Sequence, residues 1–316
     1  MSKVRVCFLG TPEFAVTSLQ ALIADEHYEV VGVITQPDRP AGRKMQLTPS
    51  PVKTLALSRG LRVIAPESLK KNPEALEEVK KWGAEVAVVV AFGQILSQEF
   101  LSLFPFGAVN VHGSLLPRWR GAAPIQRSLE AGDKEGGVSL QRVVKKLDAG
   151  DIIGTRRVPL DEEITATELY EKLALLGADL LRVELMDYVR GNLVPLPQDE
   201  ALVTYAPKIE KSEGEIRWLL PAVEIHNKVR AFTMGPGSFT TWAGKKIKIH
   251  KTRVSEKAGA HPEAGRILEV NEDFISVQCG GGVLKILELQ PESRNRMKVR
   301  EFLKGHALQV GDRFGV

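Results

Sequence analysis

The sequence predicts a doubly wound, mostly parallel α/β sheet followed by a small antiparallel, OB-like β-barrel. In about the first two hundred residues, short apolar, β-branched runs alternate with helical stretches. That alternation is typical of a parallel sheet covered by helices on both faces. From residue 238 onward, short strand-like runs follow one another between glycines, as they do in small barrels. A chain of 316 residues also exceeds what one core usually supports, so two domains are expected.

The N-terminal half alternates expected strands with expected helices. The strands fall at 4–9, 29–35, 62–65, 86–91 and 107–111, and the helices at 14–24, 51–58 and 73–82. Pro51 and Pro73 fit the first turn of a helix, where the missing N–H group is tolerated. Gly60 and Gly83 fit the positions just past a helix end. These signals predict where the helices around the sheet begin and end.

The C-terminal half begins with one more strand, at 152–158, and a long helix. The helix is expected to start at the capping box Thr165-Ala166-Thr167-Glu168 and to end near Arg190. Residues 191–207 are rich in proline and lack helical periodicity, which is typical of a linker. A helix at 221–231 precedes strands at 238–241, 246–252, 265–270, 274–279 and 282–289. The predicted organisation is therefore an α/β domain over 1–190, a linker over 191–207 and a barrel domain over 208–316.

Composition and charge narrow the class of protein. The chain is 43% hydrophobic and 26% charged, without an apolar run long enough to cross a bilayer and without a signal-peptide pattern. Cys7 and Cys279 stand alone, which argues against a disulfide framework or a zinc site and favours a cytoplasmic location. Residues 208–316 carry 19 Lys and Arg against 13 Asp and Glu, whereas residues 1–207 carry 24 against 26. This asymmetry indicates either a polyanionic partner for the second half or an ordinary solvated basic face.

Asn110, His112 and Asp148 are the strongest candidates for chemistry. Asn110 and His112 are two residues apart at the end of a predicted strand, so their side chains share one face. Ligands of α/β sheets bind beyond the carboxyl ends of the strands. Asp148 lies between Leu147 and the turn residues Ala149-Gly150. Either polar strand residue alone would more often satisfy nearby backbone groups, but with the carboxylate the set favours a catalytic site.

These three residue types suit the attack of an amine on a carbonyl carbon. The Asn110 amide can donate to the oxyanion of a tetrahedral intermediate, and His112 can move protons between the two nitrogens. Asp148 would orient the imidazole and stabilise its charged form. Ser114 follows His112 too closely to define a nucleophile elbow, so direct transfer without an acyl-enzyme is the simpler interpretation. The loop at 36–44 is polar and rich in turn residues, and is either functional or an ordinary surface loop.

The chain resembles the methionyl-tRNA formyltransferase family of folate-dependent formyltransferases. The similarity rests on residues 110–126 with Asp148-Ala149-Gly150-Asp151, and on the segments 10–15, 35–43, 48–53 and 203–206. The Asn-x-His pair and the aspartate are common to all folate-dependent formyltransferases. The loop Gln36-Pro37-Asp38-Arg39-Pro40-Ala41-Gly42-Arg43 and the basic barrel narrow the resemblance to the enzymes that act on tRNA.

The resemblance implies formyl transfer from 10-formyltetrahydrofolate to the α-amine of methionyl initiator tRNA, a step of translation initiation. It assigns catalysis to Asn110, His112 and Asp148. It places Ser114, Leu115, Leu116 and Pro117 in the folate-binding motif, with Ile95 and Leu96 lining the pterin pocket. It places Arg43 at the tRNA acceptor end, and we expect Lys44, Lys245, Lys246 and Lys248 to contact tRNA as well.

A formyltransferase acting on another amine, such as a sugar nucleotide, is the main alternative. That enzyme would use the same three catalytic residues but would need neither a basic second domain nor a loop for the acceptor stem. A tRNA-binding protein without activity is a second alternative, against which the intact set of three argues. We further expect a monomer that needs no metal and binds neither DNA nor membranes.

Overall fold

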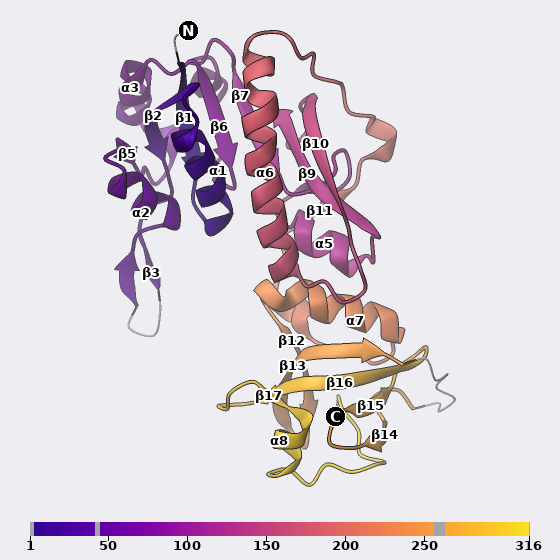
Figure 1. Cartoon of the computed structure of the whole chain (residues 1–316). Coiled ribbons are helices and arrows are strands. Elements are labelled where there is room, and N and C mark those ends of the chain that lie inside the picture. The colour runs from indigo at the N-terminus through magenta and orange to yellow at the C-terminus, as the bar shows by residue number, and fades with distance from the viewer. Residues whose placement is uncertain (1–2, 42–44, 256–262, 316) are drawn as a thin grey trace. The chain divides into compact units, whose positions relative to one another are not determined.

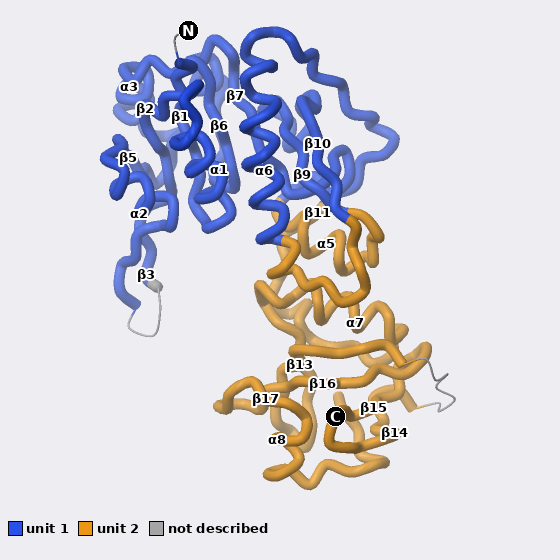
Figure 2. Tube along the Cα trace, viewed as in Figure 1, with its two compact units in different colours: residues 1–121, 136–158, 170–205 blue, residues 122–135, 159–169, 206–316 orange. Residues whose placement is uncertain are grey.

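The computed structural model describes residues 3–41, 45–255 and 263–315. They form two compact units, shown in Figure 2. Unit 1 contains residues 1–121, 136–158 and 170–205, and unit 2 contains residues 122–135, 159–169 and 206–316. These units divide the chain differently from the predicted domains, because residues 191–205 cluster with unit 1 and two segments before residue 170 cluster with unit 2.

Unit 1 is built on a seven-stranded sheet in the order β10-β9-β7-β6-β1-β2-β5 (Figure 1). Its strands are β1 (Val4–Gly10), β2 (Tyr28–Ile34), β5 (Val63–Ile64), β6 (Val86–Val90), β7 (Ala108–His112), β9 (Glu135–Arg142) and β10 (Ile152–Pro159). Strands β5, β2, β1, β6 and β7 are parallel, and β9 is antiparallel to β7. The strand order reverses between β1 and β6, so the predicted parallel-dominated α/β sheet is confirmed.

The remaining elements up to residue 206 lie between or after the strands of this sheet along the chain, and the helix at 124–130 belongs to unit 2. They are the helices α1 (Glu13–Ala24), α2 (Pro51–Ser58), α3 (Pro73–Trp82), α4 (Gln98–Leu101), α5 (Pro124–Glu130) and α6 (Ala166–Val189), the 3-10 helices η1 (Leu69–Lys71) and η2 (Glu200–Leu202), and the short strands β3 (Arg39–Ala41), β4 (Gln46–Thr48), β8 (Arg120–Gly121) and β11 (Tyr205–Ala206). The helix ends that the sequence predicts are found in the structure. The Ser50 side chain caps α2, Gly83 ends α3 in the left-handed conformation, and Glu168 accepts from the Thr165 amide at the start of α6.

The sequence did not predict α4, α5, the short strands β8 and β11 or the 3-10 helices of this region, nor did it predict two larger elements. The first is β9, whose sequence Glu-Gly-Gly-Val-Ser-Leu-Gln-Arg contains two glycines and two polar residues that are nevertheless buried. The second is the hairpin β3–β4, in which Arg39 pairs with Thr48 and Ala41 with Gln46, where the sequence indicated only a polar loop. In both, pairing with a neighbouring strand supplies stability that the local pattern does not show.

Unit 2 contains an antiparallel sheet in the order β12-β13-β16-β15-β14, with β17 paired to β16. Its elements are β12 (Ser238–Trp242), β13 (Lys245–Val254), β14 (Ile267–Val270), β15 (Ile275–Gln278), β16 (Val283–Pro291), β17 (Met297–Lys298), α7 (Ala222–Ala231), α8 (Val299–Leu303), η3 (Lys211–Gly214) and η4 (Phe232–Met234). Ile225 and Val229 of α7 pack with Ile247 and Ile249 of β13 in one apolar core. The predicted antiparallel second domain is therefore confirmed. Across the described ranges, no helix combines the length and apolar character needed to span a bilayer.

Trp82 at the end of α3 is the largest fully buried side chain of unit 1. Its ring lies over Gly32 of β2, where any Cβ atom would overlap the ring. We expect Trp82→Ala to lower the free energy of unfolding by about 3–5 kcal/mol, because it leaves a cavity against the sheet. Urea unfolding followed by circular dichroism measures this loss, with Trp82→Phe as a smaller truncation. An unchanged urea midpoint in Trp82→Ala would contradict the packing argument.

Candidate active site

β7 presents Asn110 and His112 on the same face of the sheet. Asn110 lies opposite Gln141 of β9, and His112 lies opposite Ser139. Residues that face each other across a strand pair project to the same side, so all four polar side chains share one surface. Because β7 is next to β6 and near the reversal of strand order, this surface lies where ligands of α/β sheets bind.

His112 is buried, with 6% of its surface exposed, and one of its ring nitrogens makes a hydrogen bond. Its Nε2 atom lies 2.9 Å from the carbonyl oxygen of Trp119. A carbonyl can only accept, so Nε2 carries a proton and Nδ1 is the nitrogen that can take up another. Nδ1 lies 3.8 Å from Oδ2 of Asp148. The carboxylate is therefore close enough to stabilise a proton gained at Nδ1.

Asp148 lies in the turn between β9 and β10 with φ at +47°, in the left-handed region. Its Oδ2 accepts from the amide of Gly121 at 2.8 Å, and its Oδ1 accepts from Nε2 of Gln141 at 3.1 Å. Two residues later, a Cβ atom on Gly150 would overlap the carbonyl of Arg142, so only glycine allows this close turn. The chain thus holds the carboxylate by both oxygens and by its main chain.

The structure brings the three predicted catalytic residues to one surface. The Asn110 side chain is partly buried, and it makes no hydrogen bond to any other residue in the described part of the chain. Its amide is therefore available to donate to an oxygen atom on a bound substrate. Together with a proton acceptor at His112 and the carboxylate of Asp148, this arrangement provides what addition of an amine to a carbonyl requires.

The predicted folate-binding residues 114–117 form a turn directly after β7, and hydrogen bonds stabilise this turn. The Ser114 hydroxyl donates to the carbonyl of Arg118 at 2.7 Å, and Ser139 donates to the carbonyl of Ser114 at 2.8 Å. Ser139 also accepts from the amide of Leu116 at 3.1 Å. Leu116 is buried, Leu115 is partly buried, and the Leu116–Pro117 peptide is cis. Ser114 is thus engaged within the turn, and its predicted contact with folate stays a prediction.

The two residues predicted to line the pterin pocket differ in exposure. Ile95, which follows β6, is 79% exposed, although it is large and apolar. Leu96 is partly buried and packs against the core that includes Phe92 and Phe100. A large exposed apolar side chain is suited to contact a ligand. The predicted role of both residues stays a prediction.

Neither cysteine is suited to act as a nucleophile. Burial raises the pKa of the Cys279 thiol to about 12, and it raises that of Cys7 even further above its usual range. Both thiols are therefore protonated near neutral pH, in line with transfer that uses no acyl-enzyme. Within the described ranges, no cluster of three or more His, Cys, Asp or Glu side chains could hold a metal ion.

The residues predicted to contact tRNA fall in two places. Arg43 and Lys44 lie outside the described residues, between β3 and β4. Lys245, Lys246 and Lys248 are exposed at the start of β13. There they alternate with the buried core residues of that strand, so Lys246 and Lys248 project from its outer face. The ammonium of Lys246 lies 3.4 Å from the centre of the Phe239 ring, a favourable cation–π contact.

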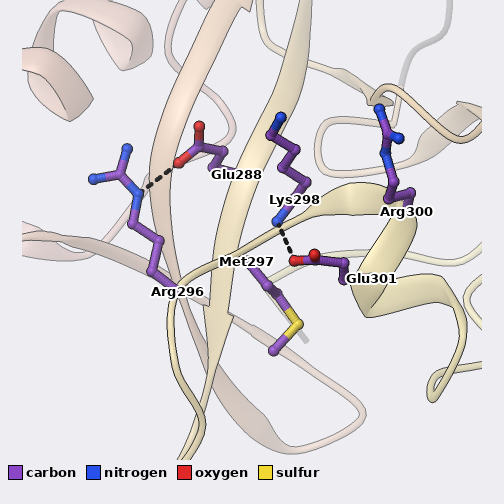
Figure 3. A pocket seen from close by; sticks show the side chains of 6 residues that line it. All are labelled: Glu288, Arg296, Met297, Lys298, Arg300 and Glu301. Carbon is purple, nitrogen blue, oxygen red and sulfur yellow. Dashed lines mark hydrogen bonds and ion pairs between the residues drawn. The ribbon is translucent and has the colours of Figure 1, made fainter.

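A further basic pocket, which was not predicted as a site, lies beside β16. It has a volume of about 390 Å³ and is shown in Figure 3; its lining residues are Glu288, Arg296, Met297, Lys298, Arg300 and Glu301. Arg296 pairs with Glu288 at 2.6 Å. Lys248 and Lys298 both lie opposite residues of β16, at Gln290 and Glu288 respectively. Cations from β13 and β17 therefore flank the same strand of unit 2.

Sequence reasoning missed the polar residues that support the catalytic pair. Gln141 and Ser139 belong to the unpredicted strand β9. Arg120, Gln198 and Thr204 also contact the site, although the last two fall in the segment predicted as a linker. The Thr204 hydroxyl accepts from the amide of Trp119 at 2.9 Å. The only available signal was the resemblance, which included Arg120 and Thr204 in its motifs without giving them a role.

Comparison with known proteins agrees with this fold and shows the family of the chain. The family model described as formyl transferase matches residues 3–183, and the formyl transferase C-terminal domain matches residues 208–307. A sugar 3N-formyl transferase solved with dTDP and 5-N-formyl-THF is 19% identical, with a TM-score of 0.68, and the match covers 93% of this chain and 100% of that one. HypX from Aquifex aeolicus, solved with tetrahydrofolic acid, is 18% identical with a TM-score of 0.61, over 98% of this chain and 51% of that one. At these identities the two structures show the fold alone.

Sequence relatives are much closer. Methionyl-tRNA formyltransferase of Bdellovibrio bacteriovorus is 66% identical over 318 residues, covering 100% of both chains. The protein of the same name from Myxococcus xanthus is 46% identical over 311 residues, covering 98% of each chain. The chain therefore belongs to the methionyl-tRNA formyltransferase family of formyl transferases.

Proposed function

We propose that the chain transfers the formyl group of 10-formyltetrahydrofolate to the α-amino group of methionine on initiator tRNA. The observation that carries the reaction is the gathering of Asn110, His112 and Asp148 on one surface at the end of β7, with His112 Nδ1 facing the carboxylate at 3.8 Å. The methionyl-tRNA acceptor is supported by the full-length relatives that bear that name. The reaction would take place in the cytoplasm, with the protein acting as a monomer.

In this mechanism the methionine amine attacks the formyl carbon directly. The Asn110 amide donates to the oxygen that becomes negatively charged in the tetrahedral intermediate. His112 accepts the amine proton at Nδ1, and Asp148 stabilises the imidazolium that results. The same proton then goes to the departing folate nitrogen. Residues 114–117 together with Ile95 and Leu96 would hold the folate.

We assign tRNA binding to the region 208–316 and to the loop that contains Arg43 and Lys44. The exposed Lys245, Lys246 and Lys248 support this assignment, since phosphate contacts dominate protein–RNA affinity. Burial lowers the pKa of the nearby His250, so this imidazole stays neutral near pH 7. The positive charge of this surface then comes from lysine and arginine, and tRNA affinity should change little between pH 6.5 and 8.

An acceptor panel separates this function from formylation of a sugar nucleotide. The purified protein is given 10-formyltetrahydrofolate with methionyl initiator tRNA, methionyl elongator tRNA, or an amino-sugar nucleotide. We expect rapid formylation of the initiator alone. Preferential formylation of the sugar nucleotide would overturn the proposed acceptor but not the proposed chemistry.

Reversing the charge of Lys245, Lys246 and Lys248 to glutamate should weaken tRNA binding. For each phosphate contact that is lost, tRNA binding releases fewer counterions. The magnitude of the slope of log affinity against log salt concentration should therefore fall by about one per contact. Binding measured by fluorescence anisotropy at several salt concentrations tests this expectation. A control carries the same charge change at the exposed Lys71, Lys80 and Lys81 of unit 1. An equal loss of tRNA affinity in both variants would show that affinity depends only on net charge. The tRNA-binding surface would then not be at these three lysines.

A further inference from the structure

The side chain of Gln198 makes hydrogen bonds to the main chain of the turn that carries Asp148. The Nε2 atom of Gln198 donates to the carbonyl of Asp148 at 2.9 Å and to the carbonyl of Gly150 at 2.7 Å. It also lies 3.3 Å from Oε1 of Gln141, the residue that donates to the Asp148 carboxylate. One amide group thus bonds two carbonyls of the same turn. These bonds help to offset the energetic cost of the left-handed conformation of Asp148.

Arg120 determines which way the Gln198 amide points. The Nε and Nη2 atoms of Arg120 donate to Oε1 of Gln198 at 3.0 and 2.8 Å. A guanidinium has no acceptor, so the carbonyl end of Gln198 must face Arg120 and its NH2 group must face the turn. The orientation of Gln198 therefore follows from the chemistry of its neighbour.

The main chain around Arg120 contacts both members of the catalytic pair. The preceding residue, Trp119, accepts from Nε2 of His112, and the following residue, Gly121, donates to Oδ2 of Asp148. Arg120 therefore lies between the group that fixes the histidine and the group that fixes the carboxylate. Its side chain also acts on the turn that carries Asp148, here called the aspartate turn, because it bonds Gln198, which in turn bonds the Asp148 carbonyl.

The charge of Arg120 is compensated at the same turn. The Arg120 side chain is wholly buried, and its Nη2 lies 2.9 Å from Oε1 of Glu200. The other oxygen of Glu200 accepts from Lys146, two residues before Asp148, at 2.7 Å. Hydrogen bonds from Arg120 and Lys146 lower the pKa of Glu200, so this carboxyl stays ionised. The Nη1 atom of Arg120 is buried without a partner among the described residues. An unpaired buried donor lowers the stability of the fold, so a contribution to stability does not by itself explain this arginine.

We propose that Arg120 and Gln198 are positioning residues that set the aspartate turn so that the Asp148 carboxylate faces Nδ1 of His112. This inference rests on the catalytic roles proposed above for His112 and Asp148. Neither positioning residue needs to touch substrate. Their effect is to hold the carboxylate where the imidazolium forms, and a displacement of about 1 Å at such a site can cost about 100-fold in rate.

Gln198→Leu removes both the bonds to the turn and the acceptor for Arg120. We expect kcat for formylation of methionyl-tRNA to fall by about 100-fold with KM little changed. Arg120→Lys keeps the positive charge but loses the planar guanidinium that spans Gln198 and Glu200, so it should also lower kcat with KM little changed.

Two measurements separate positioning from a loss of folding. In an Asp148→Asn background, Gln198→Leu should have little further effect on kcat, because the carboxylate that it positions is already gone. The amide of Gly121, which donates to that carboxylate, should exchange faster in Gln198→Leu when followed by NMR. The control is Arg156→Met, which breaks the pairs of Arg156 with Asp179 and Glu184 in the same unit. It should lower stability while leaving kcat and the exchange of the Gly121 amide unchanged.

An unchanged Gly121 amide together with an unchanged kcat in Gln198→Leu would overturn the proposal, as would full additivity with Asp148→Asn. Failure of the proposed acceptor is distinguishable from this. If the wild-type chain formylated a different amine, the Gly121 amide would still respond to Gln198→Leu, and the positioning role would stand.

Discussion

Replacing His112 with alanine is expected to lower kcat for formyl transfer by about 10²- to 10⁴-fold. The amine must lose its proton as it attacks, and Nδ1 of His112 is the acceptor that the Trp119 carbonyl leaves unprotonated. Without this imidazole, water, which is a much weaker base, would have to accept the proton. Initial rates of tRNA formylation at saturating folate measure the loss.

The control for this change is His27→Ala. The His27 side chain is exposed in unit 1 and, among the described residues, bonds only Asp25, so its removal should leave the rate unchanged. The free energy of unfolding is measured for both variants, since His112 is buried and its truncation leaves a small cavity. If His112→Ala folded and retained wild-type kcat, the assignment of the proton acceptor would be wrong.

Replacing Asp148 with asparagine should lower kcat by about 100-fold or more. The variant loses the negative charge that stabilises the imidazolium, a charged interaction worth about 1.5–3 kcal/mol. Its amide nitrogen would also face a donor, either the Gly121 N–H or the Gln141 amide. The loss should appear in kcat rather than in KM, because the charge acts only after the proton has moved to His112. Steady-state kinetics with both substrates varied separates the two parameters.

Asp151→Asn is the matched control for the charge. Asp151 lies three residues further along, is 40% exposed and forms a 3.7 Å ion pair with Arg142 at the surface. Surface pairs of this kind contribute little to stability, so this variant should be close to wild type. Equal losses in the two asparagine variants would mean that general charge around the turn, not the carboxylate at His112, governs the rate.

Much of the fold follows from local patterns. The helix starts at Pro51 and Pro73 and the capping box at Thr165 are short-range signals, and each is found where expected. β9 could not be found this way, because its Ser139 and Gln141 are polar yet buried. Their burial is compensated by hydrogen bonds to Ser114, Leu116, Asp148 and Gln198, all of which lie outside the strand.

The same reasoning explains why residues 191–207 resembled a linker. Prolines and the lack of a helical period describe the local backbone, but not its contacts. In the structure, Leu196 pairs with Ile152, Gln198 with the Asp148 turn and Thr204 with Trp119. Nothing in the sequence of this segment indicates those partners.

The sequence by itself determined the α/β class, the antiparallel second domain and the identity of Asn110, His112 and Asp148 as one chemical set. Periodicity, capping signals and a two-residue spacing on a strand are local properties, so they can be seen without a fold. The tertiary structure decided how the set is arranged. The Trp119 carbonyl selects the nitrogen of His112 that accepts a proton, and Gln198 holds the turn of Asp148 in a left-handed conformation. These are hydrogen bonds between residues far apart in the chain, and only the folded backbone brings their atoms within reach.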